Sequence, residues 1–168
     1  DRNALRQWIS YTLEFKESKL DVTVFLDKNS TKLNYKVECD WQEKPVKGKY
    51  VPQLNFHVPL NYKCKAYKYD IPFGTIERPE IDDDVPANSW MAGIPAQGDN
   101  IVMLVTDTKY GFRGYEDSLA VDLLRSSYDP DPYPELGIHK FGFAIDVISN
   151  PDNRNLDDSN PDNKELIN

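Results

Sequence analysis

The sequence predicts an all-β protein folded as an antiparallel β-sandwich. Along most of the chain apolar and polar side chains alternate with a period of two, which is typical of half-buried strands. Aromatic residues make up 12% of the chain, a composition that favours strands. Twelve Pro and eight Gly supply turns between them. With 168 residues the chain is long enough to form one domain with a hydrophobic core.

The expected strands follow from this alternation, element by element. The clearest is 33–41, where Leu33, Tyr35 and Val37 alternate with polar residues. The other expected strands are 9–15, 20–26, 54–60, 62–66, 101–105, 119–124 and 141–147. Turn-forming segments separate them: DKNS, KPVKG, RPEIDDD, QGDN and DPDPYPELG. Eight or more antiparallel strands with long connections predict a sandwich.

The C-terminal tail differs from the rest. SNPDNRNL at 149–156 is nearly repeated as SNPDNKEL at 159–166. Two copies are too few for a solenoid, which needs about three. We therefore expect a β-sandwich domain over 1–148 and a polar tail or linker over 149–168. Because the chain begins at Asp1 without Met, we expect a processed protein or a fragment.

Charge and hydropathy exclude some partners. The net charge is −8, which argues against nucleic acid or an anionic membrane surface as the main partner. No apolar run approaches the roughly 20 residues of a membrane span. The sequence therefore favours neither nucleic acid nor membrane.

Residues that could bind metal or act as nucleophiles are few. Cys39 and Cys64 fit no metal-ligand spacing and lie on apolar sides of alternating runs, so we expect buried free thiols. A disulfide between neighbouring strands is the alternative. His57 and His139 are the only histidines and form no ligand pattern. We therefore expect neither a protein-supplied zinc site nor Cys–His catalysis.

Acidic runs occur at IDDD (81–84) and DPDP (129–132). Their oxygens could bind calcium, but the spacing matches no EF-hand loop. Solvated acidic turns are the favoured interpretation. With 28 acidic residues in the chain, a pair of carboxylates alone gives no weight to glycosidase chemistry.

Two polar segments flank the run 119–124. In VTDTKYGFRG (105–114), Gly111 and Gly114 are expected to give a turn its conformational freedom. In RSSYDPDP, Arg125 ends an apolar strand beside acidic residues. A structural salt bridge is favoured there over a substrate-contacting role. Lys109, Tyr110 and Arg113 raise the same choice.

Four segments in fixed order carry a family resemblance: YDIPFGTIERP (69–79), MAGIPAQ (91–97), VMLVTDTKYGFRG (102–114) and LAVDLLRSSYDPDPYPELGIHKFGFAI (119–145). With KLNYKVECDWQEK and LNFHVPLNYKC before them, they resemble the C-terminal β-sandwich region of glycoside hydrolase family 38 α-mannosidases. The bacterial and cytosolic branch is most similar. The resemblance covers about residues 8–148 and implies a sandwich of the galactose mutarotase-like kind.

The resemblance implies a function that lies mostly outside this chain. Family members cleave terminal α-mannosides with retention, through an Asp nucleophile and a zinc ion, in an N-terminal α/β barrel domain. Nothing in this chain corresponds to that barrel, so no catalytic or metal residue is carried over. The implied picture is an inactive fragment with no cofactor of its own. Its partner is the barrel, through which it meets mannoside, and the bacterial cytoplasm is the implied location.

The resemblance also suggests residues at the substrate rim. The family's Lys-Tyr-Gly, Leu-Leu-Arg-Ser and Pro-Asp-Pro match 109–111, 123–126 and 130–132. If any residue here faces substrate, we expect Arg125 first, then Tyr110 and Asp131. The connector MAGIPAQGDN is shorter than is usual in the family, which puts the geometry of its neighbouring loop in doubt.

The number of strands between the two loops decides whether both lie at the same end of the sheet. One strand between the two loops would place them at opposite ends of the sheet, unless the chain folds back within YGFRGYED. We therefore favour the loop that carries Arg125 as the one facing the barrel. VTDTKYGFRG is then expected to be a turn whose glycines have a structural role and not a role at the substrate rim.

Two other functions remain open from the residues alone. An autonomous carbohydrate-binding module would need exposed aromatic rings to stack on sugars, and the loop residues Tyr115, Tyr128 and Tyr133 could supply them. A partner-docking domain would make no sugar contact at all.

Overall fold

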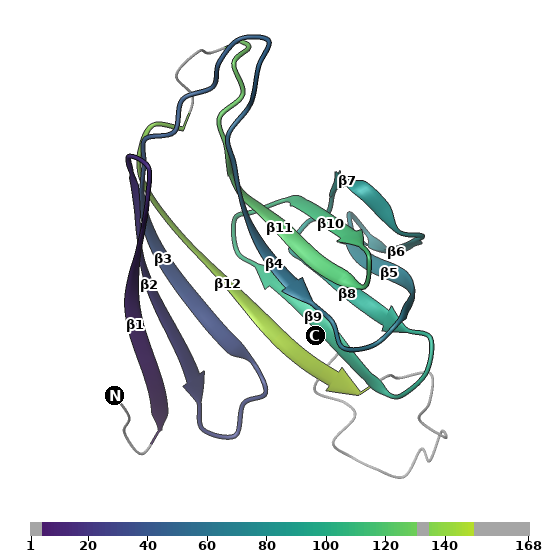
Figure 1. The fold of residues 1–168 in the computed structure, drawn as a ribbon. Coiled ribbons are helices and arrows are strands. Elements are labelled where there is room, and N and C mark those ends of the chain that lie inside the picture. The colour runs from purple at the N-terminus through teal and green to yellow at the C-terminus, as the bar shows by residue number, and fades with distance from the viewer. Residues whose placement is uncertain (1–4, 131–134, 150–168) are drawn as a thin grey trace.

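The computed structural model describes residues 5–130 and 135–149, and these form twelve β-strands (Figure 1). The strands are β1 Arg6–Phe15, β2 Ser18–Asp27, β3 Leu33–Trp41, β4 Gln53–Pro59, β5 Cys64–Ile71, β6 Gly74–Arg78, β7 Ile81–Pro86, β8 Trp90–Pro95, β9 Asn100–Thr106, β10 Gly111–Tyr115, β11 Ser118–Arg125 and β12 Gly137–Ser149. The described residues contain no helix, and hence none that could span a membrane.

The strands form two antiparallel sheets. The larger has eight strands in the order β1-β2-β3-β12-β9-β8-β5-β6, and the smaller has four in the order β4-β11-β10-β7. The two sheets face one another across a shared hydrophobic core (Figure 1). The predicted all-β antiparallel sandwich is confirmed.

The expected strands all occur, and four more lie in segments that the sequence assigned to turns and connections. RPEIDDD was expected to be a turn, but Ile81–Pro86 is strand β7. MAGIP lies in β8, which is buried on both faces and so shows no alternation. GFRG belongs to β10, which leaves only 107–110 as the loop after β9. Short strands and strands buried on both sides escape a search for period-two patterns.

Large aromatic side chains fill the core. Trp41, Tyr67, Tyr69 and Phe112 are among its largest fully buried residues. Gly114 lies on β10 against Tyr67, and a Cβ at this position would overlap the tyrosine ring. Its role is therefore close approach within a strand, which corrects the expectation of turn freedom.

Both cysteines are free thiols, as expected, although only Cys39 is fully buried and Cys64 is half-buried. Burial raises the pKa of the Cys39 thiol to about 11. A thiol with such a pKa is inert near neutral pH.

The small sheet covers only part of the large one. At its edge β4 reaches β3 and β12, where the ring of Phe56 lies 5.0 Å from Tyr35 and 4.3 Å from Phe143, between centroids. Beyond this edge the hairpin β1–β2 extends the large sheet with no described strand of the small sheet over β1, although Leu20 and Val22 of β2 are buried (Figure 1). We call its uncovered inner surface the open face, formed by Ile9, Tyr11, Leu13 and Leu26.

Candidate functional site

The two polar loops singled out in the sequence lie at the same end of the small sheet. The chain folds back at Glu116 and Asp117, whose φ angles of 47° and 53° suit a tight two-residue hairpin turn. Strands β10 and β11 then pair antiparallel, with Phe112 opposite Val121. Two strands therefore separate the loops, and the expectation of opposite ends is wrong. The chain does fold back within YGFRGYED, which was the stated exception to that expectation.

Two of the three rim candidates are exposed at this end. Arg125 is the last residue of β11, opposite Gln53 of β4, and its side chain is exposed. Tyr110 is 60% exposed, and its carbonyl accepts a hydrogen bond from the amide of Ala87 at 3.0 Å. Asp131 lies outside the described residues. Lys109 is half-buried, with its Nζ 4.9 Å from the centre of the Phe141 ring.

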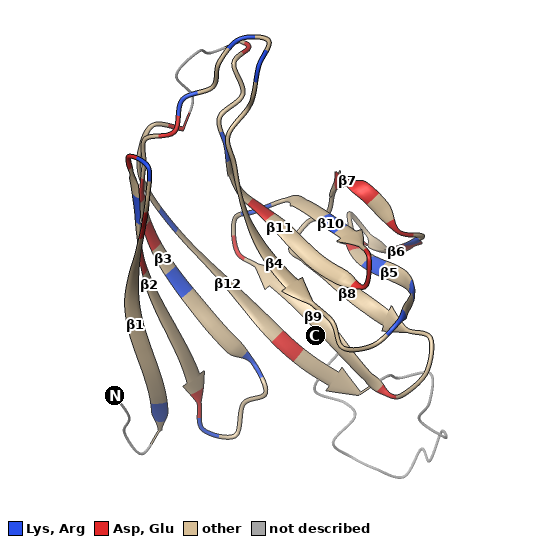
Figure 2. Ribbon diagram, in the orientation of Figure 1, with Lys and Arg blue, Asp and Glu red and all other residues tan. Residues whose placement is uncertain are grey.

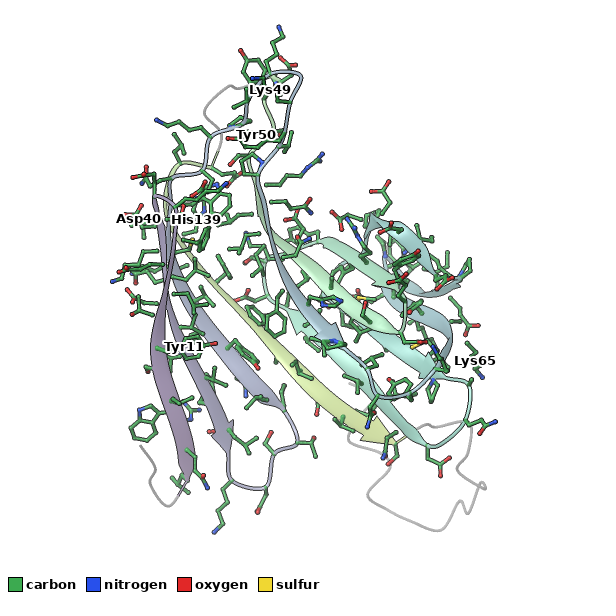
Figure 3. All side chains as sticks on the ribbon, in the orientation of Figure 1. Tyr11, Asp40, Lys49, Tyr50, Lys65 and His139 are labelled. Atoms are coloured by element: carbon green, nitrogen blue, oxygen red, sulfur yellow. The ribbon has the colours of Figure 1, made fainter. Side chains whose placement is uncertain are left out.

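Long connections extend from the same end. The β3–β4 connection, which carries Lys49 and Tyr50, stands out there (Figure 3). The amide of Ser126 binds the carbonyl of Pro52 at 3.0 Å, so the segment after β11 is joined to this connection. The side-chain hydroxyl of Ser126 accepts the indole N–H of Trp41 at 2.6 Å, and both side chains are fully buried. In the Arg-Ser pair, therefore, the serine is internal and the arginine faces out.

An acid–base cluster occupies the outer face of the small sheet. The Arg113 guanidinium binds the carboxylates of Asp84 and Asp82, at 3.2 Å and 3.1 Å. The side-chain amide of Gln53 donates to Asp84 at 2.6 Å. In Figure 2 acidic residues, in red, lie on both β7 and β11 of this sheet. Arg113 is thus fixed in structural ion pairs, whereas Arg125 makes no ion pair with any described residue.

Asp122 of β11 is the unusual member of this cluster. Its Oδ1 atom is buried and has no hydrogen-bond partner among the described residues. Desolvation, aided by the charge of Asp84, raises its pKa to about 6, although Arg125, Lys109 and Gln53 favour the ionised form. The carboxyl is therefore harder to ionise than that of an exposed aspartate. Strong shifts of this kind occur at functional sites and in structural networks alike.

A shallow hollow of about 290 Å³ lies further along the same face. It is lined by His57, Asn55, Arg113 and Tyr115, with small residues such as Ala120 at its floor. The face as a whole offers hydrogen-bond donors and acceptors, among them the side chains of His57, Asn55 and Arg113.

Comparison with known proteins identifies the family. The family model described as the glycosyl hydrolases family 38 C-terminal domain matches residues 1–133. The chain belongs to glycosyl hydrolase family 38. The matched residues include the first three motif segments and the fourth as far as residue 133, and the family resemblance is thereby confirmed.

Two curated relatives named α-mannosidases are much longer than this chain. Alpha-mannosidase G of Dictyostelium discoideum is 28% identical over 131 residues, which cover 73% of this chain and 11% of that protein. Alpha-mannosidase 2C1 of Mus musculus is 26% identical over 136 residues, covering 76% and 12%. The chain thus spans about a tenth of the length of these relatives.

Solved family 38 structures share the fold. An α-mannosidase from Enterococcus faecalis V583 superposes with a TM-score of 0.65 at 14% identity, covering 80% of this chain and 16% of that one. A structure described as a protein in glycosyl hydrolase family 38 from Enterococcus faecalis gives the same values.

The zinc that the family 38 resemblance implies finds no suitable ligands in the described residues. They hold no group of three or more His, Cys, Asp or Glu side chains that could bind a metal ion. Asp82 and Asp84 are engaged by Arg113 instead. The described side chains therefore do not fit a zinc site.

Sequence reasoning missed three residues of this face. Asp122 was hidden inside an apolar run, although the period-two alternation places it on the same side of β11 as Ser118 and Ala120, opposite the core residues Leu119 and Val121. Asp84 was assigned to a solvated turn, but it lies half-buried in β7. Gln53 was expected on the polar side of the alternating run 54–60, but nothing in the sequence distinguished it from the other polar residues there.

The loop aromatics do not converge into one platform. Tyr115 ends β10 at the hairpin turn, whereas Tyr128 follows β11 at the opposite end of the sheet, beneath Lys47. Tyr133 lies outside the described residues.

Proposed function

We propose that this chain is the non-catalytic C-terminal β-sandwich domain of a zinc-dependent, retaining α-mannosidase that hydrolyses terminal α-mannosides. The observation that carries the proposal is the match of residues 1–133 to the family's C-terminal domain. Both curated relatives are named α-mannosidases, and this chain corresponds to a small part of each. Zinc, retention, contact with a catalytic barrel and a cytoplasmic location are part of the proposal.

Within the enzyme, the proposed role at the rim belongs to Arg125 and Tyr110. Both are exposed at the end of the small sheet where the two motif loops meet. A guanidinium without a partner in the described structure and a tyrosine hydroxyl can both hold sugar hydroxyls or orient a carboxylate of the catalytic domain. Asp131 follows in the same segment and remains a candidate.

The first experiment tests the non-catalytic role. The purified chain is incubated with an aryl α-mannoside, with and without a chelator, and its zinc content is measured. We expect no turnover and no tightly bound zinc. Chelator-sensitive hydrolysis would overturn the proposal, and saturable binding of mannose by the chain, followed by tryptophan fluorescence, would favour an autonomous carbohydrate-binding module.

The second experiment tests the rim role in the full-length enzyme. Arg125→Ala is expected to lower kcat/KM by about tenfold with an unchanged melting temperature, because positioning is lost while packing is kept. Lys65→Ala is the control, because Lys65 is also exposed but lies far from the Lys49–Tyr50 end (Figure 3). A loss of stability without a loss of turnover would assign Arg125 to structure.

A further inference from the structure

The hairpin β1–β2 has two chemically different faces. On its outer face polar side chains pair across the strands: Ser10 with Thr23 at 2.9 Å, and Arg6 with Asp27 at 2.5 Å. The Arg6 guanidinium also lies 4.1 Å from the centre of the Phe25 ring. This face satisfies its own polar groups and can remain in water.

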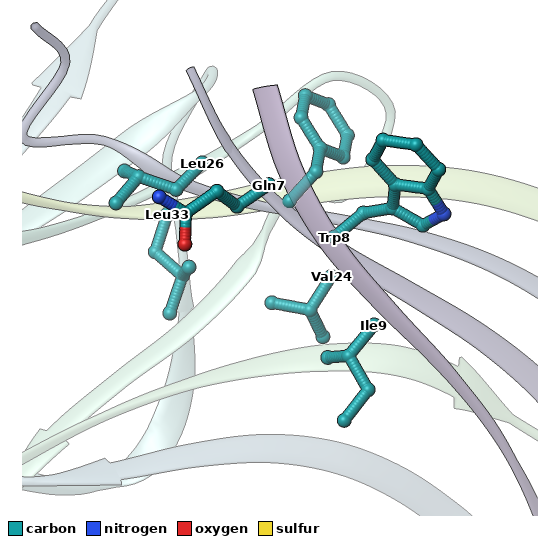
Figure 4. Close-up of a pocket in the computed structure, with 7 residues that line it drawn as sticks. Gln7, Trp8, Ile9, Val24, Leu26 and Leu33 are labelled. Carbon is teal, nitrogen blue, oxygen red and sulfur yellow. The ribbon is translucent and has the colours of Figure 1, made fainter. Parts of the chain in front are cut away.

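The open face carries no charge, and no strand among residues 5–130 and 135–149 covers it. Ile9 is 62% exposed, Tyr11 41% and Leu13 50%, although all three project to the core side of the large sheet. Figure 3 shows Tyr11 well apart from the strands of the small sheet. A hollow of about 380 Å³ lies at one end of the face, where Ile9 lies beside Val24, close to Leu26 and Leu33 (Figure 4). A contiguous apolar surface of this kind marks an interaction site.

The edge of the small sheet faces the same space. Among the described strands β4 pairs only with β11, so its other edge has no strand partner in this part of the chain. Its inward side chains, Leu54, Phe56 and Val58, are only partly buried, although they belong to the core. A further strand beside β4 would pair with this edge and at the same time cover the open face.

We infer that the space bounded by the open face and the free edge of β4 seats one or more apolar strands from the part of the parent α-mannosidase that lies outside this chain. The inference rests on the proposed function, since it requires a parent enzyme. The curated relatives extend far beyond the matched region, which is 11–12% of their length. The uncharged open face suits an apolar strand, whereas a second copy of this chain would bring another net charge of −8.

Thiol labelling in the full-length enzyme tests this inference. Ile9→Cys and Ser10→Cys place a thiol on opposite faces of the same strand, and the unsubstituted protein gives the background from Cys39 and Cys64. We expect a maleimide to modify Ile9→Cys at least about tenfold more slowly than Ser10→Cys, because a covered thiol reacts only after local opening. Equal rates would overturn the inference.

Hydrogen exchange on the unsubstituted enzyme gives a second readout that needs no variant. The β4 amides that are not bonded to β11 are expected to be protected, and fast exchange there would also overturn the inference. If protection of Ile9→Cys appears only as protein concentration rises, a second copy covers the face and the assignment to the parent chain is wrong. Chelator-sensitive turnover by this chain alone would instead refute the proposed function, independently of the labelling result.

Discussion

The two halves of the large sheet have similar strands but different surroundings. Around β5, β8 and β9 the small sheet lies over the inner face, and Tyr69, Met91 and Leu104 are completely buried. In the hairpin β1–β2 the alternation is at least as regular, yet half of its apolar face is exposed. A period-two pattern therefore specifies which face of a strand is apolar, but not which element covers it.

Leu13 and Leu20 make this contrast measurable within one pair of residues. They are direct partners across β1 and β2, but Leu13 is 50% exposed and Leu20 only 6%. In this chain Leu20→Ala should cost about 3 kcal/mol of unfolding free energy, because it leaves a cavity. Leu13→Ala should cost about 0.5 kcal/mol, because little burial is lost. Urea denaturation of both variants checks this.

In the full-length enzyme the two costs should become similar if the open face is covered there. A persistent difference between Leu13→Ala and Leu20→Ala in that protein would mean that the hairpin stays open.

Close packing in the covered half predicts a second effect. Gly114→Ala inserts a methyl group into the buried ring of Tyr67 and should cost about 2 to 3 kcal/mol. Gly111→Ala is the matched control from the same strand, because its added Cβ would lie 3.4 Å from the nearest atom, Cβ of Asp122. Thermal unfolding of both variants shows whether Gly114 is required because a side chain would not fit there or because the backbone needs the conformational freedom of glycine. Equal losses would contradict the assigned role of Gly114.

One buried hydrogen bond joins β3 of the large sheet to the segment that follows β11 of the small sheet. Ser126→Ala leaves the indole N–H of Trp41 without its partner and should cost about 2 kcal/mol. Ser127→Ala, one residue further on and only partly buried, should change stability by less than about 0.5 kcal/mol. An equally small loss at Ser126 would show that water replaces the hydroxyl.

The sequence predicted most of the fold because one-sided strands carry a local signal. The run 33–41 alternates over nine residues, and strand β3 has the same bounds. Strand β8 could not be found in this way, because burial of both faces removes the alternation and Ala92 and Gly93 are small. The hairpin turn at Glu116 and Asp117 also escaped detection, since neither residue is the glycine or asparagine usual there.

The candidate site was predicted only in part. Arg125 and Tyr110 came from the family resemblance, and the structure places them at the same end of the small sheet. The cluster of Asp84, Arg113 and Asp122 joins residues from three strands. Which strands are neighbours depends on sheet order, and no local pattern encodes that order.

Asp122, on the outer face of the small sheet, should make the free energy of unfolding depend on pH. Burial raises its folded-state pKa to about 6, above the value of roughly 3.9 expected when unfolded. Between these values the folded protein binds more protons than the unfolded one, so this group makes stability fall as pH rises from about 4 to 6. Below that window the penalty is absent, and above it the penalty is complete. Partial exposure and screening limit it to about 1 kcal/mol.

Asp122→Asn removes this titration while keeping the shape of the side chain. The stability of the variant relative to the unsubstituted chain should therefore increase by about 1 kcal/mol between pH 4 and pH 7, measured by urea denaturation at each pH. Asp83→Asn, at an exposed carboxylate on β7, is the control for the loss of one negative charge from the same sheet. If the Asp122 difference is flat between pH 4 and pH 7, the carboxyl is ionised in the folded protein throughout. Its neighbours Arg125 and Lys109 then outweigh its burial.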